Sequence, residues 1–179
     1  MPLALSGPVR PPDTRGRTLQ ALAVEQRPDG PVWVIGFPDG GAARASLATG
    51  ALLPPVGPEE AQRLGVAAYA GAGHPVRVTR TPADKPPLDL RRPRPAWAVE
   101  FDDGARVYVD AETGSILALR TAQWRWFDLM WGLHILDPRG REDTSHPLLI
   151  GAAALGVAGV LTGIVLLFAR RRRRRTTRA

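Results

Sequence analysis

Residues 95–117 read PAWAVEFDDGARVYVDAETGSIL, and the alternation in this stretch decides the fold. Trp97, Val99 and Phe101 are separated by single residues, which is the period of two expected for a half-buried β-strand. The Asp103-Gly104 pair then supplies a tight turn, because glycine adopts positive φ at little cost. The alternation resumes after the turn in RVYVD. The stretch therefore predicts an antiparallel β-hairpin.

The same pattern occurs earlier in the chain. Residues 31–53, PVWVIGFPDGGAARASLATGALL, align with residues 95–117 without gaps, and eight of the 23 aligned positions are identical. The identical pairs are Pro31/Pro95, Trp33/Trp97, Phe37/Phe101, Asp39/Asp103, Gly40/Gly104, Thr49/Thr113, Gly50/Gly114 and Leu53/Leu117. Self-similarity of this kind indicates two copies of one structural unit.

A helix is predicted between the two copies. It opens at Pro58, whose fixed φ suits the first helical turn, and acidic residues follow where they favour the positive end of the helix dipole. Leu64, Ala67 and Ala68 form its predicted apolar stripe, and Gly71 is its predicted end.

Further segments complete the predicted domain. One more strand is expected before each hairpin, at residues 19–26 and 76–80, while the proline-rich residues 82–95 predict a long loop. The fold class is therefore α+β, with two related antiparallel hairpin units and a packed helix over residues 19–121, after a linker at 1–18. The residues expected to hold the hairpin fold are Trp97, Phe101, Tyr108, Asp110, Thr113 and Gly114.

The C-terminal part of the chain predicts a membrane anchor. Residues 148–169, LLIGAAALGVAGVLTGIVLLFA, are 22 uncharged residues, enough for a helix to cross a hydrocarbon core about 30 Å thick. The tail 170–179 follows at once, and its arginines are Arg170, Arg171, Arg172, Arg173, Arg174, Arg175 and Arg178. Arginines beside a span stay on the cytoplasmic side. We expect a single-pass inner-membrane protein with a cytoplasmic C-terminus and an extracytoplasmic, periplasmic domain.

The net charge of +7 does not indicate a nucleic-acid-binding protein. The tail holds seven of the 24 lysine and arginine residues, which leaves 17 basic and 17 acidic residues in the rest of the chain. A nucleic-acid-binding domain needs its basic excess on the folded surface, so we expect no nucleic-acid partner. The chain has no cysteine, which excludes disulfides, thiolate metal sites and a cysteine nucleophile.

The second copy, with DAETG after a YV strand and a preceding helix that begins PEEA, resembles the PepSY domain. That family is an extracytoplasmic α+β module, also found in metallopeptidase propeptides, and residues 31–53 look like a degenerate first copy. The order of hairpin, aromatic and histidine-containing segment, and span is similar to the membrane-linked branch of the family. Its members usually carry an N-terminal membrane helix, which residues 1–30 do not contain, so we expect the natural start to lie upstream.

Residues 122–147, between the predicted domain and the span, are expected to form an interfacial segment. Residues 123–136 predict an amphipathic helix, and the candidates for its apolar face are Trp124, Phe127, Trp131 and Ile135. Tryptophan concentrates at the headgroup level, where its ring is apolar and its N–H stays wet. The predicted membrane-interface residues are Trp124, Trp126, Phe127 and Trp131, with the lipid bilayer as partner.

His134 and His146 are the candidate cofactor ligands of this segment. They flank Asp137, Glu142 and Asp143, and neutral imidazole is a common ligand of metal or haem. Relatives of the PepSY family are associated with iron-regulated membrane proteins and ferric reduction, so the resemblance also implies that the two histidines could hold haem or a metal. The other interpretation is an interfacial histidine bonded to a carboxylate or a lipid headgroup, with no cofactor. His74, in a Gly-Ala-Gly-His-Pro turn, is expected to be an exposed loop residue.

Three functional interpretations follow. The first is a binding or regulatory module that presents a sheet face or edge to a membrane or periplasmic protein. We expect this module to have no catalytic activity, because its sequence contains no nucleophile elbow, phosphate-binding loop or HExxH motif. The second is an accessory subunit of a membrane redox or iron-reduction system. The third, peptidase inhibition, is implied by the family resemblance alone. In the span, Gly159 and Gly163 form a GxxxG pair that would allow a homodimer or docking of another helix.

Overall fold

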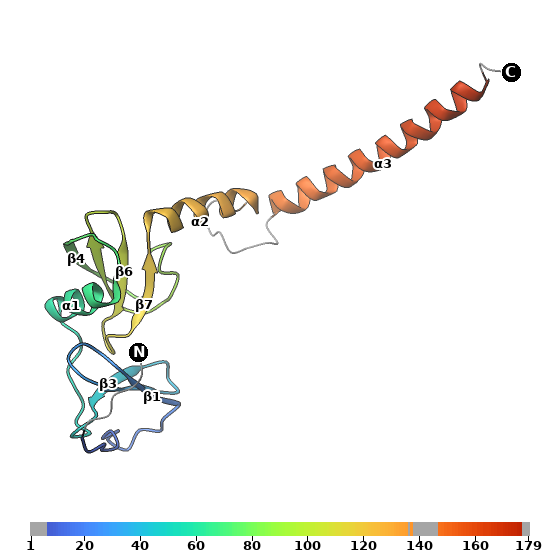
Figure 1. Cartoon of the computed structure of the whole chain (residues 1–179). Coiled ribbons are helices and arrows are strands. Elements are labelled where there is room, and N and C mark those ends of the chain that lie inside the picture. The colour runs from blue at the N-terminus through green and yellow to red at the C-terminus, as the bar shows by residue number, and fades with distance from the viewer. Residues whose placement is uncertain (1–6, 136, 138–146, 177–179) are drawn as a thin grey trace. The chain divides into compact units, whose positions relative to one another are not determined.

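The computed structural model describes residues 7–135, 137 and 147–176, and these form two compact units that divide after Arg125. The first unit contains two antiparallel sheets and helix α1 (Pro58–Ala68), which packs on the second sheet (Figure 1). In order, the strands of the first sheet are β1 (Ala21–Glu25), β2 (Val32–Gly36) and β3 (Ala42–Ser46). Those of the second sheet are β4 (Pro75–Thr81), β5 (Ala96–Phe101), β6 (Arg106–Asp110) and β7 (Ile116–Arg120).

Two further helices complete the described chain. Helix α2 (Ala122–His134) begins in the first unit and continues into the second, which also contains α3 (Pro147–Thr176). The α+β class is confirmed, as are the two strands predicted before the hairpins, which are β1 and β4. Residues 82–95 contain no helix or strand, as expected.

The two sequence copies have the same strand register. Trp33 pairs with Ala45 in the first sheet, and Trp97 pairs with Val109 in the second. Every pairing of β2 with β3 recurs between β5 and β6 at positions 64 residues later. The repeat found in the sequence is therefore a repeat of backbone pairing.

Glycines hold the same turns in both copies. Gly40 and Gly104 have φ of 80° and 82°, and Gly50 and Gly114 have φ of 77° and 78°. A residue with a Cβ rarely adopts this left-handed conformation, whereas glycine does so at little cost. The four identical glycines thus explain why both hairpins turn at the predicted positions.

The side chain of Asp110 organises the second turn of its copy. This buried carboxylate accepts the backbone N–H groups of Glu112 and Thr113, both at 2.9 Å, and the Nε–H of Arg94 at 2.8 Å. In the first copy Ser46 takes the corresponding place, with its hydroxyl 3.4 Å from the backbone nitrogen of Thr49. Asp110 is one of the residues expected to hold the hairpin fold.

Helix α1 packs on the second sheet largely through the predicted apolar stripe. Leu64 is buried and Ala68 packs against the same core, whereas Ala67 is exposed and its prediction was wrong. The buried residues of the helix are Ala61, Leu64 and Gly65. A Cβ added to Gly65 would lie 2.9 Å from a methyl group of Val99, so the absence of a side chain lets helix and sheet approach closely.

Each copy begins with the same pair of hydrogen bonds. The indole N–H of Trp33 donates to the carbonyl of Arg10 at 2.8 Å, and that of Trp97 donates to the carbonyl of Val56 at 2.8 Å. The backbone N–H groups of Arg10 and Val56 then donate to Leu47 and Ala111, which occupy matched positions. Arg10 is therefore the structural counterpart of Val56.

The two copies diverge directly after these residues. From Val56 the chain needs 24 residues to reach Arg80, the partner of Trp97, whereas from Arg10 it needs only 14 to reach Val24, the partner of Trp33. The longer connection of the second copy contains α1. In the first copy, the described residues between Arg10 and β1 contain turns but no helix.

A different side chain completes the outer end of each hairpin. In the second copy the ring of Tyr69 lies 4.3 Å from that of Phe101, and its hydroxyl donates to Asp103. This hydrogen bond raises the pKa of Tyr69 and lowers the pKa of Asp103. In the first copy the guanidinium of Arg17 lies 3.5 Å from the centre of the Phe37 ring and donates to Asp39 at 2.7 Å. Arg17 thus replaces Tyr69 where the helix is missing.

The loop at residues 82–95 covers the other face of the second sheet. Leu90 belongs to a cluster of buried residues that also contains Tyr108. The Tyr108 hydroxyl donates to Asp89 at 2.7 Å, and Arg120 donates its Nε–H to the backbone carbonyl of Asp89 at 2.7 Å. Burial, together with the hydrogen bond to Asp89, raises the pKa of Tyr108 far above its ordinary value.

Candidate membrane interface

Helix α3 is long and apolar enough to cross a membrane. The candidate span runs from Pro147 to Arg170, which agrees with the predicted residues 148–169, and none of its most apolar stretch is buried. In the part of the chain that the structure describes, no other helix meets this criterion. A helix with apolar side chains exposed on all sides needs an apolar surrounding.

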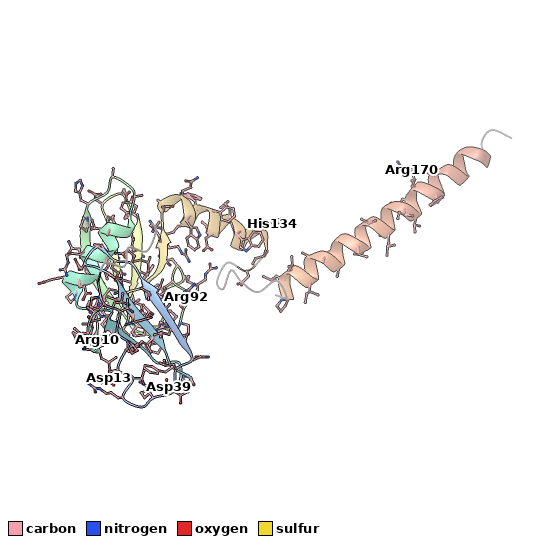
Figure 2. All side chains as sticks on the ribbon, turned by 60° about the horizontal axis from the view of Figure 1, so that its bottom comes forward. Arg10, Asp13, Asp39, Arg92, His134 and Arg170 are labelled. Carbon is pink, nitrogen blue, oxygen red and sulfur yellow. The ribbon has the colours of Figure 1, made fainter. Side chains whose placement is uncertain are left out.

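The arginines follow the apolar residues without a break. Arg170 is exposed, and residues 171–175 continue in the same helix. Figure 2 labels Arg170 near the C-terminal end of α3. The helix therefore carries cationic residues at one end of its apolar stretch.

Helix α2 exposes a broad aromatic face. Trp126 is 66% exposed and Phe127 is 68% exposed. Met130, Trp131 and Leu133 are exposed on the same side, because these five residues fall within an arc of about 160° around a helix with 100° between residues. Large aromatic side chains exposed in a continuous group mark an interaction surface.

The exposed face differs from the predicted one at both of its ends. Trp124 is half-buried, and the guanidinium groups of Arg120 and Arg91 lie 4.1 and 5.8 Å from its ring. Ile135 is buried, as are Asp128 and Gly132 on the same side of the helix. Spacing alone did not reveal which side of the helix is covered.

His134 is exposed on the aromatic side of α2, and Figure 2 labels it at the end of that helix. Its ring lies 6.0 Å from the ring of Trp131. Asp137, three residues later, is buried and lies outside the helix, whereas His146, Glu142 and Asp143 lie outside the described residues. Among the described residues, no group of three histidine or acidic side chains is placed to hold a metal ion.

The other histidine lies where it was expected. His74 is exposed in a loop, with its Nδ1 3.5 Å from Asp102. Gly159 and Gly163 are one turn apart on α3. No other described residue lies within 4 Å of a Cβ added at either position, so the structure does not test a helix contact there.

Sequence reasoning missed two buried arginines between the copies. Arg44 of β3 forms a paired interaction with Glu60 of α1, with Nη2 to Oε2 at 2.8 Å, and this hydrogen bond lowers the pKa of Glu60. Arg27 donates to the carbonyl of Thr113 in the second copy and to Glu25. Burial of Arg27 lowers its pKa. No local pattern predicts the contacts of Arg44 with Glu60 and of Arg27 with Thr113, because they join residues 16 and 86 positions apart.

A cavity of about 390 Å³ lies beside these arginines. Arg27, Arg44 and Glu60 are part of its wall. Arg44 is paired with Glu60, and Arg27 is paired with Glu25 through Nη2 alone, while its Nε and Nη1 have no hydrogen-bond partner among the described residues. Comparison with family models, with curated proteins and with solved structures finds no match to this chain.

Proposed function

We propose that this chain is a membrane-anchored, extracytoplasmic binding module of PepSY type with no catalytic activity of its own. The observation that carries the proposal is α3, an exposed apolar helix of spanning length that continues directly into arginines. Because arginines next to a span are retained in the cytoplasm, the two sheets belong on the opposite side of the membrane.

Helix α2 fits the same placement. Its exposed tryptophans and phenylalanine would enter the headgroup region of the bilayer, where aromatic rings are most stable. Burial of this face in lipid removes apolar surface from water. The two sheets would then be held close to the membrane by two contacts, the span and the interfacial helix.

Topology is tested by protease protection of the membrane-inserted full chain. Protease added to the outer side of the inner membrane is expected to digest the sheets and leave the C-terminal tail protected. A matched variant with glutamine in place of the six residues 170–175 is expected to lose uniform orientation. Sheets that are protected from outside, or a chain found in the soluble fraction with an intact C-terminus, would contradict the proposal.

The interfacial role of α2 is tested by tryptophan fluorescence in liposomes that contain brominated lipids. Quenching is expected for Trp126 and Trp131 and not for Trp33 and Trp97, which belong to the sheets. The double variant Trp126→Phe, Trp131→Phe should remove most of the quenching. No quenching in the unaltered chain, or quenching that the double variant leaves unchanged, would contradict the interfacial placement of Trp126 and Trp131.

The module carries no cofactor in this proposal. A purified preparation of the membrane-inserted chain is expected to be colourless. A Soret absorption band that disappears in His134→Ala would replace the proposal with a haem-binding accessory subunit.

A further inference from the structure

Strand β1 is an edge strand whose outer side is open. It has a neighbour only on the β2 side within the described chain. Residues 15–23 are all exposed, and Leu22 is 42% exposed. An edge strand presents unpaired backbone N–H and C=O groups, which can pair with another strand.

The corresponding edge of the second copy is protected. Strand β4 begins with Pro75, has an irregular register at that end, and carries Arg77 and Arg80. Prolines, bulges and positive charges are the usual means of preventing edge pairing. At the matched positions β1 has Ala21 and Val24, and its pairing with β2 is regular along its whole length.

We propose that β1 pairs antiparallel with β1 of a second copy of this chain, around a two-fold axis at Leu22. A two-fold axis perpendicular to the sheet keeps each face on its own side, so opposing residues must belong to the same face. The two Leu22 side chains would then lie opposite each other. Ala21 would oppose Ala23, and Gln20 would oppose Val24.

The residues of β1 favour its own copy as the partner. The interface of a two-fold dimer must be self-complementary, and this pairing brings no like charges together. Glu25 is the only charged residue of β1. Its carboxylate is held by Arg27 and by the Ser115 hydroxyl at 2.7 Å, and it would face Leu19 of the other copy. A charged strand of another protein would find no complementary charge along this edge.

Pairing between two five-residue strands forms only a small interface. The dimer therefore depends on the membrane anchoring proposed above, which brings the two chains together. Confinement to one membrane raises the effective concentration of the two strands. The small residues Gly159 and Gly163, one turn apart on α3, allow a second contact between the same two chains, since small residues let membrane helices approach closely. Two weak contacts in one pair of chains reinforce each other.

The test uses disulfide formation, because the chain contains no cysteine. The full-length variant Leu22→Cys is reconstituted in phosphatidylcholine liposomes and oxidised with copper phenanthroline and oxygen, which convert two thiols into one disulfide. The expected product is a covalent dimer. Val78, the equivalent of Leu22 on β4, packs against the core, so the control is its exposed neighbour Thr79→Cys, where only background cross-linking is expected.

A second variant separates pairing from folding. Ala21→Arg, added to Leu22→Cys, restores the arginine that β4 carries at the matched position and should lower the yield of dimer about tenfold. Circular dichroism of this variant should be unchanged, since the second copy accommodates arginine there. Cross-linking of Leu22→Cys no higher than that of Thr79→Cys, or cross-linking unaffected by Ala21→Arg, would overturn the proposal. Sedimentation of the liposomes reports anchoring separately, so a failure of the anchor is distinguished from a failure of pairing.

Discussion

The two copies of the hairpin unit share one backbone and differ in what covers it. In the second copy α1 packs on Val99 and its neighbours, and Tyr69 closes the end over Phe101. In the first copy the chain after Arg10 is ten residues shorter, and Arg17 closes the end over Phe37. The comparison teaches that register and turns survive the loss of a helix. The buried hydrophobic cluster of the first copy is smaller than the one under α1 in the second copy.

Replacement of the matched phenylalanines by alanine should cause the largest losses of unfolding free energy and so test most strongly how the two cores differ. Phe37 and Phe101 are equally buried, at 3% exposure each, so burial alone predicts equal losses. Truncation of a buried phenylalanine costs about 3–5 kcal/mol, and we expect Phe101→Ala to lie at the upper end because its core is larger. Urea unfolding of the full chain in detergent micelles measures both variants. An equal or larger loss in Phe37→Ala would show that the helix adds nothing to the core.

The matched positions 44 and 108 test the polar contacts. Arg44→Ala leaves Glu60 without its main partner, and removal of one member of a buried ion pair costs about 3 kcal/mol. Tyr108→Phe removes one hydrogen bond to Asp89 and should cost about 1 kcal/mol. Urea unfolding of the two variants measures which loss of stability is larger. A smaller loss for Arg44→Ala would mean that this ion pair does not join the copies.

Gly65 tests the close approach of α1, which has no equivalent in the first copy. Gly65→Ala places a Cβ 2.9 Å from Val99, and overpacking of this kind costs about 1–2 kcal/mol. The control is Gly57→Ala just before the helix, where a Cβ meets nothing within 4 Å. This control changes the N-cap residue of α1 and should lose about 0.5 kcal/mol, less than Gly65→Ala. Equal midpoints of thermal unfolding for the two variants would contradict the close approach.

The smallest expected effect is a pH dependence of the same ion pair. The hydrogen bond from Arg44 lowers the pKa of Glu60 below its usual value of 4.5. The folded chain therefore holds the proton less tightly than the unfolded chain, and stability is lost as the pH falls from 4.5 through the lowered pKa. Glu60→Gln should flatten this part of the curve of unfolding free energy against pH. An unchanged slope would assign the acid sensitivity to other carboxylates.

Local signals explain what could be predicted from the sequence. The alternation around Trp97 and the turn glycines act within a few residues, and both hairpins, both preceding strands and the span were predicted close to their observed bounds. Distant contacts explain what was missed. The burial of Arg27 and Arg44 depends on residues of the other copy, and the covered side of α2 depends on more than the spacing of its apolar residues.

The second pair of turn glycines also lies against close neighbours. A side chain at Gly50 would collide with the carbonyl of Pro11, and one at Gly114 would collide with the guanidinium of Arg27. Each of these corners therefore excludes a side chain for two separate reasons, the positive φ and the packing. Neither glycine could be replaced without moving a part of the chain that lies far away in the sequence.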